Sequence, residues 1–204
     1  KSLVSRQINL IKSRGIDNIN IIGGYLSDQF KNEEINLIVN SDYEKTNMVY
    51  SLFCAESILN EDVIVSYGDI AYSAEILDKL IESKNEISVV IDLEWSHYWG
   101  KRFTNPLEDL ESLKMNAKSE IIDIGQKVNS IDEIQGQFIG LIKFSETGVQ
   151  KMKNVYKELS YDGEIMSKSI KEAYMTDFLQ EMINKGNKLN AIKIHDPWVE
   201  IDTI

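Results

Sequence analysis

Short runs of branched aliphatic residues alternate with helical segments along residues 1–91. A helical spacing of apolar residues precedes Gly15 and recurs over 47–59 and 74–81. The apolar runs between these segments are Ile19–Ile22, Leu37–Val39, Val63–Val65 and Ile87–Ile91. Strands that are apolar on both faces are typical of a mainly parallel sheet covered by helices on both sides. The alternation therefore predicts an α/β fold.

The rest of the chain continues this pattern with longer elements. We predict strands at Gln137–Phe144 and Leu189–Ile194, and helices at 146–159 and 169–185. Residues 93–125 differ, because a polar and aromatic loop there is followed by strand-like alternation around a turn. A length of 204 residues is ordinary for one domain. We therefore predict a single domain over 1–204, in which 93–125 form a loop and a hairpin.

The chain is strongly acidic. It has 22 lysine and arginine residues against 33 aspartate and glutamate residues, a net charge of −11. Proteins that bind nucleic acid usually carry a basic stripe, which this sequence lacks, so nucleic acid is not expected as a partner. The single cysteine, Cys54, excludes a disulfide within the chain and favours a reducing compartment, so we expect a cytoplasmic protein. No apolar run approaches the roughly 20 residues that span a bilayer, so we expect no membrane partner. Whether the chain forms a homo-oligomer stays open.

Carboxylates at two positions suit a divalent cation. Asp69 follows Gly68 directly after an apolar strand, where ligands of α/β folds bind, and it could hold Mg²⁺ or simply form a turn. Glu200 and Asp202 are two residues apart, so in an extended segment both side chains point to one face. Such a pair could complete a Mg²⁺ site with phosphate oxygens, or could belong to a solvated tail.

The loop over 95–102 combines three large rings with basic groups. Aromatic faces suit an ammonium group, and the basic groups suit a phosphate or phosphonate. The alternative is a lid that packs on the sheet and exposes its charges. The residues concerned are Trp95, His97, Tyr98, Trp99, Lys101 and Arg102. A binding loop is the interpretation that we favour.

Several longer motifs carry a resemblance to a known family. They are Asp92-x-x-Trp95-x-x-Tyr98-Trp99-x-x-Arg102-Phe103-x-Asn105-Pro106-Leu107-x-Asp109, Ile124-Gly125-Gln126-Lys127, Gly136–Ser145, Ala173–Gln180 and Trp198-x-Glu200-Ile201-Asp202-Thr203. With these motifs the chain resembles the bacterial CTP-dependent nucleotidyltransferases that act on phosphocholine and on phosphonates such as 2-aminoethylphosphonate. The resemblance implies a three-layer α/β/α, Rossmann-like nucleotidyltransferase fold with a mixed, mainly parallel sheet.

The resemblance also implies a reaction and its residues. CMP would pass from CTP to a small phosphorylated or phosphonate acceptor, with release of pyrophosphate and with Mg²⁺ as cofactor. The implied metal ligands are Asp69, Glu200 and Asp202, and the implied catalytic groups are Asp69, Asp202, Lys127 and Lys143. The implied CTP contacts are Gly24, Tyr25, Asn47, Ser51 and Gly68. The implied acceptor contacts are Asp92, Trp95, Tyr98, Trp99, Arg102, Asp109 and Gly140.

The family's glycine-rich phosphate loop is not found in the sequence. Members of the family begin with a strand and a G-x-G-x-R loop that cradles the triphosphate, whereas this chain begins at what resembles the helix that follows. We therefore expect about 30 further residues before Lys1. Two other functions stay open, a sugar-1-phosphate nucleotidyltransferase and a non-catalytic nucleotide-binding module. A metal-dependent glycosyltransferase is disfavoured, because no D-x-D motif surrounds Asp69.

Overall fold

The computed structural model describes residues 2–30, 35–96, 110–165, 168–195 and 197–201. Its helices are α1 (Leu3–Lys12), α2 (Met48–Phe53), α3 (Ala74–Glu82), α5 (Glu146–Asp162) and α6 (Met175–Asn184). Its strands are β1 (Asn20–Gly23), β2 (Asn36–Val39), β3 (Val63–Ser66), β4 (Ile70–Tyr72), β5 (Ile87–Asp92), β6 (Glu111–Met115), β7 (Glu120–Lys127), β8 (Gln137–Phe144), β9 (Glu164–Ile165), β10 (Lys168–Ser169), β11 (Leu189–Ile194) and β12 (Trp198–Glu200). Short 3₁₀ turns include η3 (Glu56–Ile58) and η6 (Ile170–Glu172).

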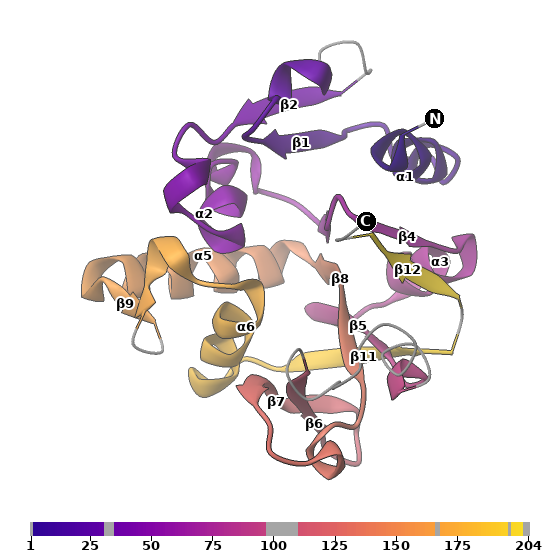
Figure 1. The fold of residues 1–204 in the computed structure, drawn as a ribbon, viewed down its shortest axis with the longest axis vertical. Coiled ribbons are helices and arrows are strands. Elements are labelled where there is room, and N and C mark those ends of the chain that lie inside the picture. The colour runs from indigo at the N-terminus through magenta and orange to yellow at the C-terminus, as the bar shows by residue number, and fades with distance from the viewer. Residues whose placement is uncertain (1, 31–34, 97–109, 166–167, 196, 202–204) are drawn as a thin grey trace.

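The central sheet has six strands in the order β3-β8-β5-β11-β7-β6. Strands β3, β5, β11 and β6 run in one direction, and β8 and β7 oppose them. Strand β8 lies between β3 and β5 and pairs antiparallel with both. The described neighbours with parallel hydrogen bonds in this sheet are β5 and β11. The predicted mixed, mainly parallel sheet is confirmed in its strand directions, because four of the six strands run the same way. A separate parallel pair, β1 and β2, lies beyond it at the top of Figure 1.

Two apolar clusters lie on the two faces of the sheet. In β5, Val89 packs with residues of α2, α5 and α6, whereas Val90 packs with residues of α3. Successive strand residues point to opposite faces, so the fully buried β5 contributes to both clusters. Helices therefore cover both faces, as Figure 1 shows, and the expected three-layer α/β/α arrangement is confirmed.

Two predicted helices are shorter than their apolar spacing suggests. The segment 47–59 forms α2 and then the 3₁₀ turn η3. Helix α2 begins after Asn47, whose side chain accepts a hydrogen bond from Met48 N. The segment 169–185 first forms η6, and α6 begins only after Tyr174, because Asp177 accepts a hydrogen bond from Tyr174 N. Local side-chain caps thus decide where these helices begin.

The last described strand, β12, pairs with a strand that lies much earlier in the chain. Strand β12 pairs antiparallel with β4, and Glu200 lies opposite Ile70. Figure 1 shows the two strands side by side near α3 and the C-terminal end. In the described part of the chain, no helix is both long and apolar enough to cross a membrane.

Candidate functional site

The turn between β3 and β4 brings Asp69 beside β12. Strand β3 ends at Ser66, and Tyr67, Gly68 and Asp69 lead into β4. The backbone N–H of Ile201 donates a hydrogen bond to the Asp69 carbonyl oxygen at 2.9 Å. The pairing of β12 with β4 thereby places the Glu200 segment next to the Asp69 turn. Two of the three predicted metal ligands are brought together in this way.

One oxygen of the Asp69 side chain has no hydrogen-bond partner in the described part of the chain. This atom, Oδ1, is buried. Buried polar atoms without partners are rare, and each calls for an explanation such as a bound ion or water. Carboxylate oxygens are the ligands that Mg²⁺ prefers, so Asp69 fits the metal that the sequence predicts.

Tyr67 packs tightly at the base of this turn. Its ring lies against Gly140, where an added Cβ would come within 2.6 Å of the ring, and Gly140 has a φ of +81°. It also contacts the edge of Phe138, with ring centroids 5.8 Å apart. The Tyr67 hydroxyl donates to Met48 Sδ at 3.1 Å. Gly140 was predicted to contact the acceptor, and the structure shows that it makes room for the Tyr67 ring.

Negative charge converges on the Tyr67 hydroxyl. Burial raises the pKa of Tyr67 far above its usual range, and the charges of Glu111, Asp69 and Glu200 raise it further. Three carboxylates from β6, the β3–β4 turn and β12 therefore act on one point. Glu111 also accepts a long hydrogen bond of 3.4 Å from Thr176 Oγ1. Sequence reasoning missed Glu111, because only the folded sheet brings β6 to this edge.

Asp92 anchors β12 through the Trp198 side chain. It is 3% exposed, its Oδ2 accepts a hydrogen bond from Trp198 Nε1 at 2.9 Å, and its Oδ1 accepts one from Glu94 N at 2.8 Å. Trp95 is 6% exposed and belongs to the apolar cluster on the α3 face. Both side chains are used inside the protein, and the acceptor contacts predicted for Asp92 and Trp95 stay predictions.

Lys143 lies at the other end of the sheet. It pairs in register with Ile64, near the start of β3, and its Nζ donates to the carbonyl oxygens of Ile81 and Ser83 at 2.8 and 3.0 Å. Lysine groups stabilise helix C-termini by satisfying carbonyls that have no partner within the helix. In this structure the Lys143 side chain binds the end of helix α3, and its predicted catalytic role stays a prediction.

Replacing Lys143 by methionine should therefore affect stability and not catalysis. We expect the free energy of unfolding to fall by about 1–2 kcal/mol, because two hydrogen bonds to a charged donor are lost. The kcat and KM for pyrophosphate release should stay within about twofold of wild type. Urea unfolding and steady-state kinetics measure the two quantities. A large loss of kcat with unchanged unfolding would return Lys143 to the active site.

Four of the five predicted CTP contacts lie just after β1 or at α2. Tyr25 is 73% exposed beyond β1, and Gly24 allows close approach of the Tyr43 ring. Asn47 begins α2, and Ser51 accepts a hydrogen bond from Asn40 Nδ2 at 3.0 Å. Asn40 is 2% exposed and was missed by sequence reasoning. These CTP contacts stay predictions.

Other predicted residues lie in the turn, on β7 or outside the described residues. Gly68 is exposed in the turn before Asp69, and Lys127 is exposed at the end of β7, opposite Glu111 in register. The residues outside the described part are Tyr98, Trp99, Arg102, Asp109 and Asp202.

Among the described residues, no group of three or more histidine, cysteine, aspartate or glutamate side chains is close enough to hold a metal ion. A complete metal site would therefore need Asp202 or substrate oxygens.

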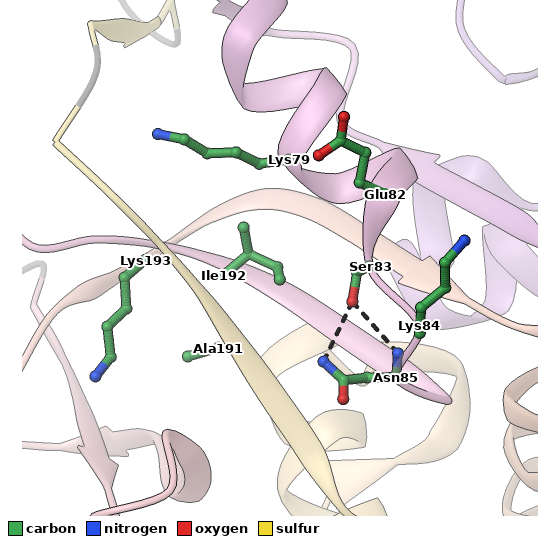
Figure 2. Close-up of a pocket in the computed structure, with 8 residues that line it drawn as sticks. All are labelled: Lys79, Glu82, Ser83, Lys84, Asn85, Ala191, Ile192 and Lys193. Carbon is green, nitrogen blue, oxygen red and sulfur yellow. Dashed lines mark hydrogen bonds between the residues drawn. The ribbon is translucent and has the colours of Figure 1, made fainter.

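A shallow depression of about 450 Å³ lies at the end of α3, away from these carboxylates (Figure 2). Ser83 Oγ accepts hydrogen bonds there from Asn85 N and Nδ2. Lys79 and Lys193 point to one side and Lys84 to another, as Figure 2 shows. Because these charges do not converge, the depression does not form an anion site.

Comparisons with known proteins agree with the sequence motifs. The chain is 41% identical to the CTP:phosphoglutamine cytidylyltransferase of Campylobacter jejuni, over 99% of this chain and 84% of that protein. No protein-family model matches the chain.

Solved structures with the same fold are nucleotidyltransferases. The inositol-1-phosphate CTP transferase from T. maritima superimposes with a TM-score of 0.72 at 16% identity, over 98% of this chain and 76% of that one. The CTP:phosphocholine cytidylyltransferase from Streptococcus pneumoniae superimposes with a TM-score of 0.69 at 20% identity, over 100% of this chain and 81% of that one. These likenesses establish the Rossmann-like fold, and the identity to the Campylobacter enzyme establishes kinship. The chain belongs to the family of CTP-dependent nucleotidyltransferases.

Proposed function

We propose that this protein is a cytidylyltransferase that transfers CMP from CTP to a small phosphorylated acceptor that carries an amino group. The observation that carries the proposal is the buried Oδ1 of Asp69, which has no partner among the described residues and lies beside the Glu200 strand, in a chain 41% identical to a cytidylyltransferase. Such a pair of carboxylates at a strand-end edge is suited to phosphate chemistry that depends on a divalent cation.

Asp69 and Glu200, with Asp202, would hold Mg²⁺. When bound, the ion would supply positive charge to the phosphate oxygens of the nucleotide. Tyr67 supports the turn that carries Asp69, and its hydroxyl, like that of any tyrosine whose pKa is not lowered, is protonated at neutral pH. A protonated hydroxyl adds no negative charge beside the triphosphate.

The transfer itself needs no proton acceptor. An anionic phosphate oxygen of the acceptor attacks the α-phosphorus of CTP and forms a new P–O bond. The bond from the α-phosphorus to the oxygen that bridges to the β-phosphate breaks, and pyrophosphate leaves with that electron pair. Because the attacking oxygen is already ionised, the residues of this chain have to position the reactants and offset their charge. Lys127 and Arg102 are the cations that we propose for this role.

The acceptor that we favour is phosphoglutamine, because the relative named for it is 41% identical over nearly the whole chain. Its ammonium group suits the aromatic loop over 95–102, and Glu111 supplies a carboxylate near the proposed reaction centre. Phosphocholine and 2-aminoethylphosphonate share a cationic nitrogen and are the alternatives. A sugar 1-phosphate lacks such a group.

The experiment is a pyrophosphate-release assay of the full-length protein with CTP, Mg²⁺ and one acceptor at a time. The acceptors are phosphoglutamine, phosphocholine, 2-aminoethylphosphonate and glucose 1-phosphate. We expect phosphoglutamine to give the highest kcat/KM and omission of Mg²⁺ to stop the reaction. A preference for glucose 1-phosphate would contradict the acceptor class, and no turnover with any acceptor would contradict the cytidylyltransferase assignment.

Removing one ring from the aromatic loop tests acceptor recognition. In Tyr98→Ala and Trp99→Ala, the KM for the acceptor should rise about 2- to 30-fold, because each cation–π contact contributes roughly 0.5–2 kcal/mol. The KM for CTP and the melting temperature should change little. Kinetics with each substrate varied in turn, together with a melting curve, measure these quantities. Equal losses for both substrates with a lower melting temperature would show that the rings only pack the loop.

A further inference from the structure

Helix α1 inserts one glutamine side chain beneath the turn that carries Asp69. Gln7 is 9% exposed, although the polar residues Arg6 and Asn9 of the same helix are exposed. Glutamine is mostly exposed in proteins, and a buried amide costs free energy unless its hydrogen bonds are satisfied. The burial of Gln7 therefore raises the question of what its amide binds.

The Gln7 amide spans the turn from one end to the other. Its Nε2 donates to the carbonyl oxygen of Tyr67 at 2.8 Å and to that of Ile70 at 2.5 Å. Its Oε1 accepts a hydrogen bond from Ser66 Oγ at 3.1 Å. The two bound carbonyls flank the Gly68-Asp69 dipeptide, so one planar group holds both ends of the segment.

The turn needs such support because its own residues supply little. Gly68 has no side chain, and an added Cβ there would meet no atom within 4 Å. The carbonyl of Asp69 is bound by Ile201 N at 2.9 Å, which ties the turn to β12 on its other side. Gln7 and β12 together therefore hold the backbone of the turn that carries Asp69, whose Oδ1 has no partner in the part of the chain that the structure describes.

We infer that Gln7 is a positioning residue for Asp69, which it holds in place by clamping the carbonyls of Tyr67 and Ile70. This inference rests on the proposed function for its effect on catalysis. Glutamine suits the role because one amide offers two N–H donors and one acceptor. Methionine has a similar length but neither donates nor accepts in this way, and glutamate would set carboxylate oxygens against the two carbonyls.

The test compares Gln7→Met with Arg14→Gln in the full-length protein. Arg14 is a matched control, because it lies in the turn that directly follows α1 and binds Asp78 of α3 through two hydrogen bonds, away from the Asp69 turn. In Gln7→Met, kcat should fall about 10- to 100-fold, because small displacements of a catalytic group are costly. The KM for CTP should stay within about twofold, and Arg14→Gln should leave kcat unchanged.

Hydrogen–deuterium exchange of the peptide over 66–72 provides a readout that does not depend on turnover. We expect exchange there to be about tenfold faster in Gln7→Met and unchanged in Arg14→Gln, because only the first variant frees the turn. If Gln7→Met fails to fold, Gln7→Asn replaces it, since the shorter amide cannot reach both carbonyls.

The outcomes separate this inference from the proposed function. If wild-type protein shows no turnover, the cytidylyltransferase proposal fails, while faster exchange over 66–72 in the variant still supports the clamp. Unchanged exchange and unchanged kcat in Gln7→Met would overturn the inference. Equal effects of Gln7→Met and Arg14→Gln would also overturn it, because they would show that Gln7 only docks α1.

Discussion

Replacing Asp69 by asparagine should reduce pyrophosphate release about 1,000-fold or more. The substitution keeps the size of the side chain and its backbone contacts, but it removes the negative charge that a divalent cation needs. A loss of about 4 kcal/mol in transition-state stabilisation corresponds to that factor. Steady-state kinetics at saturating CTP and acceptor, over a series of Mg²⁺ concentrations, measure the effect.

The matched control for this prediction is Asp17→Asn. Asp17 is exposed on the segment between α1 and β1, so the change removes the same charge from the chain away from the turn. Its kinetics should match those of wild type, and the melting temperatures of both variants should lie close to the wild-type value. If Asp69→Asn keeps near-normal turnover at limiting Mg²⁺, Asp69 is not a metal ligand.

Replacing Asp92 by alanine should lower the free energy of unfolding by about 3 kcal/mol. The buried carboxylate loses its hydrogen bonds with Trp198 Nε1 and Glu94 N, and the indole N–H is left without that acceptor. Because Trp198 begins β12, which also carries Glu200, activity should fall together with stability. Urea unfolding measures the stability change, and the pyrophosphate assay measures activity.

The variant Trp198→Phe separates the hydrogen bond from the ring. It removes the N–H but keeps most of the apolar contact, so its loss of stability should be smaller than that of Asp92→Ala, though in the same direction. A rise in the acceptor KM of Asp92→Ala with unchanged unfolding would restore Asp92 to the acceptor site and contradict its anchoring role.

Side-chain type alone does not separate binding residues from structural ones at three positions. Asp92, Trp95 and Lys143 have the chemistry of binding residues, yet all three are buried; Asp92 and Lys143 make hydrogen bonds within the protein, and Trp95 packs in the apolar cluster on the α3 face. A carboxylate, an indole ring or an ammonium group looks the same in a sequence whether it faces a ligand, a core or a helix end. Glu111 and Gln7 were overlooked for the converse reason, because their partners lie far away along the chain.

The amino-acid sequence by itself determined the α/β class, the positions of most strands and the placement of Asp69 after a strand end. These features depend on local patterns, because a run of apolar residues indicates a buried strand and the polar residues directly after it indicate the strand end. Only the tertiary structure decided that β8 separates β3 from β5, that β12 carries Glu200 to the Asp69 turn, and that Gln7 supports this turn. These contacts join residues distant in sequence, and they form because strand pairing and buried hydrogen bonds must be satisfied in the whole fold at once.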